Sequence, residues 1–279
     1  MRHWIDALVL RNPMRIEIAR FRRRFLGFGG SGFNNVVLAL ALLVYTGLVM
    51  LVVNVRGDMP PVAIVVFQTG LLCFFGPAML HGAIAGERER RTWDLLLVAP
   101  ISKAQIVFGK FMGAAAAIGL GTLALGLPTV FAAVAYAKTT FVDLLLAEGV
   151  SVSFGLFVCA LTLFLSARVK RPFMALGASL GTLLLAFLVV PALLLSLAGN
   201  ERLTGETILY LNPFVTLFRL MEETSSTSDY GPFIPAALYG FPHILIYLGM
   251  ALGLLIYAEK TLNFPENDVK FMPRGHQDA

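Results

Sequence analysis

Charged residues are scarce in this sequence, and their scarcity excludes an ordinary soluble domain. Asp, Glu, Lys and Arg make up 14% of the 279 residues, whereas hydrophobic residues make up 57%. Soluble domains carry about 25% charged residues, so the composition indicates a chain that lies in a lipid bilayer. The two cysteines, Cys73 and Cys159, sit inside apolar runs, and they indicate neither a disulfide framework nor a metal cluster.

A phosphate-binding loop is also missing. Such a loop needs the pattern G-x-x-x-x-G-K-[S/T], whose backbone N–H groups and Lys hold the phosphates. The glycine-rich stretch 27–32 lacks the Lys and the Ser or Thr, and Gly109-Lys110 is followed by Phe111. We therefore expect no catalytic residue, no cofactor and no metal site in this chain. Any ATP and Mg must be bound by a partner.

Long apolar runs, by contrast, are abundant. A hydrocarbon core about 30 Å thick needs about 20 apolar residues of helix. Six stretches qualify, at residues 33–53, 62–85, 111–135, 144–166, 173–198 and 236–258. The sequence thus predicts an all-α integral membrane protein. A six-span domain over residues 33–258 follows a cytoplasmic segment at 1–32 and precedes a cytoplasmic tail at 259–279.

The distribution of Lys and Arg predicts the orientation. With the N-terminus in the cytoplasm, 18 of the 22 basic residues fall in inner segments and four in outer ones. This bias matches the positive-inside rule and places both termini in the cytoplasm, with a bacterial inner membrane as the expected location. Because topology accounts for the excess of basic charge, we expect no nucleic-acid partner.

We expect the spans to be nearly free of ionisable groups, with His81 and His243 near span ends as the candidates. Carriers driven by protons or ions need intramembrane carboxylates or lysines. A carrier that powers itself is therefore disfavoured.

Residues 12–25 predict an amphipathic helix that begins at Asn12-Pro13. Its apolar stripe consists of Met14, Ile18, Phe21 and Phe25. Five arginines occupy much of the remaining circumference, so the helix should lie in the membrane interface. A simple positive-inside anchor and a mechanical element both remain open.

Residues 86–100, GERERRTWDLLLVAP, combine five charges within the first six residues with a Trp and three leucines that follow. This pattern predicts a short cytoplasmic helix that docks on a partner, because charges can set the register while Trp and Leu bury area. A helix that lies against lipid headgroups is the alternative. Since the stretch lies outside the spans, we expect truncation of Trp93 to leave the fold intact.

The segment 199–235 contains a second helix start, Asn212-Pro213. Its apolar stripe is Phe214, Leu217, Phe218 and Met221. The pattern predicts a short external helix that lies at, or dips into, the outer leaflet. A partly folded external loop is the alternative.

The stretch 86–110 resembles the ABC exporter permeases of the second export class. That family shows a Glu-rich start, then Gly-Thr-hydrophobic-Glu-Leu-Leu, a Pro and a Gly-Lys. The matching positions here are Glu87 and Glu89, residues 91–96, Pro100, and Gly109-Lys110. Arg91 replaces the usual Gly and Asp94 the usual Glu. The six spans and Asn212-Pro213-Phe214 also fit.

The resemblance implies a role for each segment. Residues 86–100 would be a coupling helix in a groove of an ATPase subunit, and the N-terminal helix would be a connector packed on the same subunit. The implied ATPase-contacting residues are Glu87, Arg88, Glu89, Arg90, Arg91, Thr92, Trp93, Asp94, Leu95 and Leu96. The external helix, with Asn212, Pro213, Phe214 and Phe218, would be re-entrant near the substrate exit. Two ATPase subunits would join two permease chains, identical or merely similar, in the lipid bilayer.

Two other functions remain as alternatives. One is a non-transporting scaffold or signalling module that uses the same ATPase. The other is an intramembrane enzyme, which would need clustered motifs such as H-E-x-x-H. The four histidines are scattered along the chain, so the enzyme is the weaker alternative.

Overall fold

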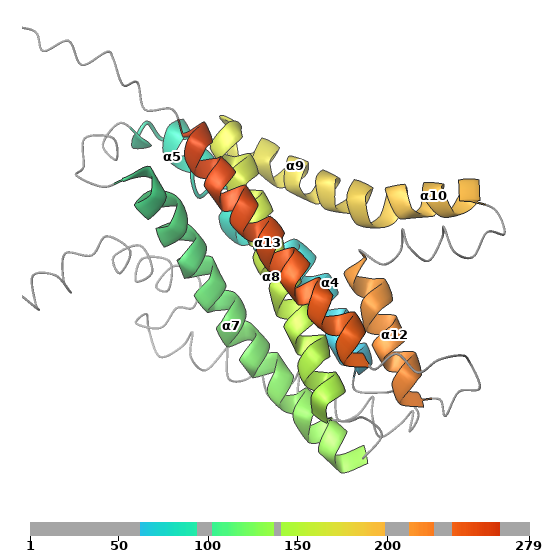
Figure 1. Ribbon diagram of the computed structural model, residues 1–279. Helices are drawn as coiled ribbons and strands as arrows, with labels where there is room; N and C mark the ends of the chain where they lie inside the picture. The colour runs from blue at the N-terminus through green and yellow to red at the C-terminus, as the bar shows by residue number, and fades with distance from the viewer. Residues whose placement is uncertain (1–61, 94–101, 137–140, 199–211, 226–235, 263–279) are drawn as a thin grey trace, which may run out of the picture.

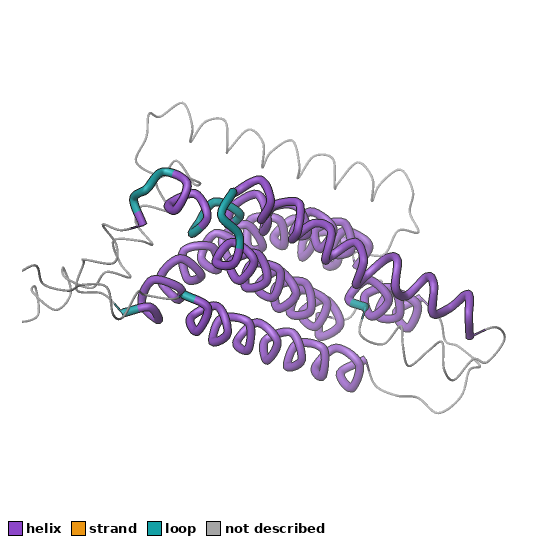
Figure 2. Tube along the Cα trace, turned by 90° about the horizontal axis from the view of Figure 1, so that it is seen from above, coloured by secondary structure: helices purple, strands orange, loops and turns teal. Residues whose placement is uncertain are grey.

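The structure is a computed structural model that describes residues 62–93, 102–136, 141–198, 212–225 and 236–262. Within these ranges the chain is helical and contains no strand (Figure 2). The helices are α4 (Val62–Leu80), α5 (Ala85–Glu89), α7 (Lys103–Tyr136), α8 (Phe141–Arg168), α9 (Pro172–Leu184), the π-helical turn η1 (Leu185–Val189), α10 (Val190–Ala198), α12 (Pro213–Ser225) and α13 (Ala236–Thr261).

Five helical segments of the described chain are long and apolar enough to cross a membrane. The predicted all-α membrane class is therefore confirmed. The predicted span at 33–53 lies outside the described residues, as does the N-terminal helix with Met14, Ile18, Phe21 and Phe25. The count of six spans stays a prediction.

Helix α8 forms the centre of the bundle, with α4, α7 and α13 packed around it (Figure 1). Its most apolar window is 78% buried, against 39% or less for the other four spans. Small residues allow α4 and α8 to approach closely. A Cβ on Gly76 would lie 2.8 Å from Val158 Cγ1, and one on Gly155 would lie 3.0 Å from Leu72 Cδ1. A larger side chain at either position would require the facing side chain to shift.

Helix α7 begins eight residues before the predicted start of the third span. The cause is a capping box, in which two side chains satisfy the free N–H groups at a helix start. The backbone N–H of Gln105 donates to Ser102 Oγ at 3.2 Å, and the N–H of Ser102 donates to Gln105 Oε1 at 2.9 Å. The first turns of α7 therefore carry polar residues beyond the apolar run.

The fifth predicted span contains the π-helical turn η1, which ends two residues before Pro191. In a regular helix the N–H of residue 191 would donate to the carbonyl of Phe187, but proline has no N–H. The side-chain amide of Asn212 donates to that carbonyl instead, at 2.8 Å. This bond ties the start of α12 to the break in the span. From α9 through α10 the chain diverges from the bundle (Figure 1).

Candidate functional site

Residues 81–93, which we call the elbow, follow the break at the end of α4. Within the predicted span 62–85, the regular helix α4 ends at Leu80 and α5 begins at Ala85. Nδ1 of His81 lies 3.0 Å from the carbonyl oxygens of both Pro77 and Ala78, so the side chain adds a polar partner to the last turn of α4. The chain turns here and returns to the bundle as α5.

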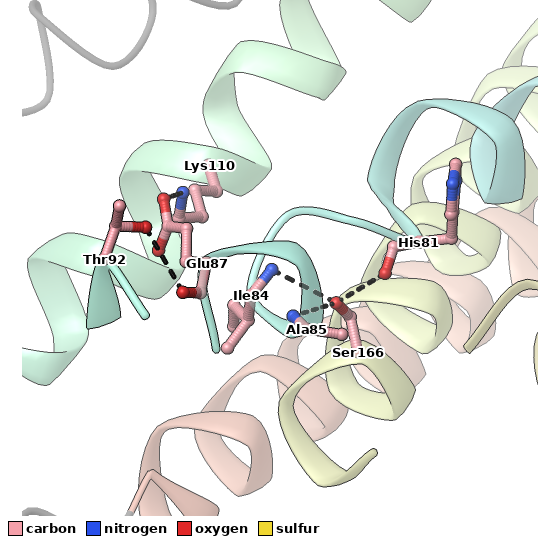
Figure 3. Close-up of polar contacts among 7 residues, drawn as sticks. All are labelled: His81, Ile84, Ala85, Glu87, Thr92, Lys110 and Ser166. Carbon is pink, nitrogen blue, oxygen red and sulfur yellow. Dashed lines mark hydrogen bonds and ion pairs between the residues drawn. The ribbon is translucent and has the colours of Figure 1, made fainter. Parts of the chain in front are cut away.

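The hydroxyl of Ser166, on α8, holds the elbow in place (Figure 3). It accepts hydrogen bonds from the backbone N–H groups of Ile84 and Ala85, both at 3.1 Å. It donates to the carbonyl of His81 at 2.8 Å. One hydroxyl thus uses its proton and both lone pairs. The N–H groups at the start of α5 find their partner on a neighbouring helix.

An ion pair joins α5 to α7. Nζ of Lys110 lies 2.7 Å from Oε1 of Glu87, and the two side chains are 9% and 24% exposed (Figure 3). Burial of this degree reduces screening by water and salt, which leaves the attraction stronger than that of a surface pair. The elbow therefore has an electrostatic link to the start of the third span.

Arg88 and Trp93 attach the elbow to the end of α8. The guanidinium of Arg88 donates to the carbonyl of Ala167 at 2.6 Å and lies 5.3 Å from the centre of the Trp93 ring. Trp93 is 9% exposed and belongs to the main hydrophobic core. Truncating it would open a cavity in that core, contrary to the expectation from its position outside the spans.

The end of α5 explains an unusual residue in the motif. The N–H of Thr92 donates to the carbonyl of Glu87 at 2.9 Å, and the N–H of Arg91 donates to that of Arg88 at 3.1 Å. This pair of bonds is a Schellman motif, which needs a left-handed residue after the helix end. Arg91 occupies that position with φ of 56°. Glycine, which is usual at this place in the family that the stretch resembles, would adopt this conformation without strain.

The ten predicted ATPase-contacting residues divide into three groups. Glu87, Arg88 and Trp93 turn inward and contact α7, α8 or the core. Glu89, Arg90, Arg91 and Thr92 are exposed on the elbow. Asp94, Leu95 and Leu96 lie outside the described residues. The contact with an ATPase stays a prediction, and the exposed group is the surface on which it would depend.

A helix occupies the residues of the predicted external helix. Asn212 caps it, since its Oδ1 accepts from the N–H of Phe214 at 3.0 Å, and Pro213 is its first residue. Of the predicted stripe, Leu217 is buried and Phe218 is 48% exposed, and Thr216, which lies beside them, is buried. The hydroxyl of Thr216 lies 2.9 Å from Nε2 of His243 on α13.

The expectation that His81 and His243 are the ionisable candidates in the spans is wrong. Glu148 lies within the predicted span 144–166 and inside α8. Its Oε2 accepts a hydrogen bond from the side-chain amide of Gln68 at 2.8 Å. A carboxylate within an apolar run was readable in the sequence, but its partner on α4 was not, since no local pattern links residues 68 and 148.

Within the described residues, no three His, Cys, Asp or Glu side chains gather as a metal site would require. A comparison with protein families matches residues 41–269 to a family described as "ABC-2 family transporter protein". A comparison with curated proteins gives no match. The family match covers most of the chain, including every described helix.

Proposed function

The chain belongs to the ABC-2 family of transporter proteins, and from this premise we propose that it is the permease subunit of an ATP-driven exporter. It is a membrane protein with at least five apolar helices of spanning length. Since the sequence holds no phosphate-binding loop, ATP and Mg would be bound by separate ATPase subunits. Two permease chains, identical or similar, would enclose the substrate pathway, and α4 and the α9–α10 segment would line it.

The elbow is the observation that carries this proposal. Its exposed surface, Glu89 to Thr92, is joined through a few bonds to two membrane helices. Glu87 links it to α7, and Arg88 links it to the end of α8. A force applied to the exposed surface would therefore reach α7 and α8 directly. This is the property needed in a segment that receives ATPase closure and moves the spans.

The segment α9–α10 supports the second part of the proposal. Only 17% of its apolar window is buried, and Leu188 and Leu193 are more than half exposed. A second permease chain, a pathway or lipid would cover this apolar surface. We assign it to the pathway and the neighbouring permease, since the family resemblance assigns the second and fifth spans to them.

Charge reversal on the exposed elbow tests the contact with the ATPase. The permease is co-expressed with an affinity-tagged ATPase subunit of the same transporter, and co-purification and the ATPase rate of the reconstituted complex are measured. We expect the double substitution Glu89→Lys with Arg90→Glu to reduce both. The matched control is Lys260→Glu, which reverses an exposed charge at the end of α13. Equal behaviour of the two variants, or wild-type assembly by both, would count against a docking role for the elbow.

The internal link is tested separately from the docking surface. Lys110→Glu places two carboxylates together and should uncouple transport from ATP hydrolysis while the ATPase still binds. The double substitution Glu87→Lys with Lys110→Glu restores an ion pair and should recover coupling. If the reversed pair performs no better than the single substitution, the pair does not transmit force.

A further inference from the structure

A buried polar cluster lies between α4 and α8, in the half of the bundle away from the elbow. Gln68, Thr69 and Ser151 are each 1% exposed or less. The Gln68 amide donates to Glu148 at 2.8 Å and lies 3.5 Å from the Ser151 hydroxyl. The hydroxyls of Thr69 and Ser151 are 2.9 Å apart. Glu148 stands seven residues into α8, about 10 Å from its start.

Helix α7 closes the third side of the cluster. A Cβ on Gly126 would lie 3.3 Å from Oε1 of Glu148, so the absence of a side chain there leaves room for the carboxylate. Thr122 stands one helical turn away on the same face of α7. Three membrane helices therefore meet around one carboxylate.

Two oxygen atoms of the cluster have no hydrogen-bond partner in the part of the chain that the structure describes. They are Oε1 of Gln68 and Oε1 of Glu148, and both are inaccessible to solvent. Buried polar atoms are nearly always satisfied in proteins, and each unmet partner is costly in lipid. An amide oxygen accepts only, and so does an ionised carboxylate, so a partner for either atom must supply a hydrogen-bond donor or positive charge.

No described basic side chain neutralises Glu148, whose hydrogen-bond partner in this part of the chain is Gln68. The titratable or charged side chains nearby on α8 and on the helices packed against it are Asp143, Cys73, Arg219, His243 and Tyr247. An unpaired carboxylate in a bundle core is strongly unfavourable.

We propose that Glu148 and Gln68, with the hydroxyl of Ser151, form a site for one monovalent cation at the junction of α4, α7 and α8. Oxygen atoms bind a single positive charge at this site, and the bound cation is either Na⁺ or a proton. Carboxylate, amide carbonyl and hydroxyl oxygens are the ligands that hard cations prefer. The cation neutralises the carboxylate at the place where α4, α7 and α8 meet.

The site is independent of ATPase docking, since it lies far from the elbow along α4 and α8. The test uses the full-length chain, purified alone in lipid nanodiscs, with the thermal denaturation midpoint as the readout. The midpoint is measured in NaCl, KCl and choline chloride at equal ionic strength, and each series is repeated from mildly acidic to mildly alkaline pH. Glu148→Gln keeps the shape and removes the charge. Asp143→Asn is the matched control, because it neutralises another carboxylate of the same helix.

For a Na⁺ site, the wild-type midpoint rises with the logarithm of the Na⁺ concentration above saturation, as linkage requires for a ligand of the folded state. Choline has no such effect, Glu148→Gln loses the response, and Asp143→Asn keeps it. Gly126→Ala retains the charge but crowds Oε1, so it weakens the response.

For a proton site, the midpoints do not depend on the salt cation. The wild-type protein is then less stable than Glu148→Gln at alkaline pH, and this difference disappears as the pH falls and Glu148 takes up its proton. If wild type and Glu148→Gln respond identically to Na⁺, K⁺ and pH, the cluster binds no cation and the proposal is wrong.

Discussion

Replacing Arg91 with glycine should stabilise the protein, although it removes a charged side chain from its surface. Arg91 has φ of 56°, and the left-handed conformation costs an L-residue about 1–2 kcal/mol. Glycine adopts it freely but loses about 0.5–1 kcal/mol more chain entropy on folding. The net gain from Arg91→Gly is therefore about 0.5–1 kcal/mol. Equilibrium unfolding of the purified permease by denaturant in mixed micelles measures the change.

Arg90→Gly is the matched control. Arg90 is the neighbouring exposed arginine, and its φ is −81°, where any residue is comfortable. Glycine there brings the entropic loss without relieving strain, so stability should fall by about 0.5–1 kcal/mol. Both variants remove one arginine charge, so electrostatic effects largely cancel in the comparison. The Schellman assignment is refuted if Arg91→Gly is as destabilising as Arg90→Gly. Arg91→Val, a β-branched residue at positive φ, should be the least stable of the three.

Three further outcomes are expected. Ser166→Ala leaves the N–H groups of Ile84 and Ala85 without their acceptor, so it should lower the free energy of unfolding by about 1–3 kcal/mol. The control Ser196→Ala removes an exposed hydroxyl on α10 and should have little effect. Equal losses in the two variants would contradict the anchoring role of Ser166. Trp93→Ala should lower it by about 3–5 kcal/mol through cavity formation, as measured by denaturant unfolding, and a loss under about 1 kcal/mol would place the ring outside the core. Single cysteines are introduced in place of Asp58 and Asp278 in a protein that lacks Cys73 and Cys159, and intact cells are treated with an impermeant thiol reagent. The cysteine at position 58 should be labelled and the one at position 278 should be protected. Labelling at both positions would overturn the predicted orientation.

The helical spans could be predicted because the bilayer imposes a length and a composition on each of them. Their ends could not be predicted from apolar runs, since helices continue into polar sequence where a cap exists. The capping box of Ser102 and Gln105 starts α7 before its apolar run. The glycines that meet another helix, such as Gly76 and Gly155, could not be identified from the sequence either, because the packing of α4 against α8 decides which they are.

The site was partly readable because its charges interrupt an apolar sequence. The sequence does not show which side chains of the elbow turn inward. Trp93 is apolar and lies beside charges, a pattern equally consistent with a partner groove and with the protein's own core. The inward direction of Glu87 and Arg88 depends on Lys110 and Ala167, which are 23 and 79 positions away from them along the chain. Only the packing of α5 against α7 and α8 brings them to the elbow.

The two breaks in the membrane helices follow one physical rule. A helix that stops or bends in a membrane exposes backbone groups that lipid cannot satisfy, so a break persists only where another segment supplies a partner. Ser166 supplies it after α4, and Asn212 supplies it at the carbonyl freed by Pro191. Each partner side chain belongs to a different segment from the one it bonds, so the two segments must move together if the hydrogen bond is to be kept. The breaks are therefore the places where movement of one helix must be accompanied by movement of another, which is the mechanical requirement of a transporter whose energy enters from outside the membrane.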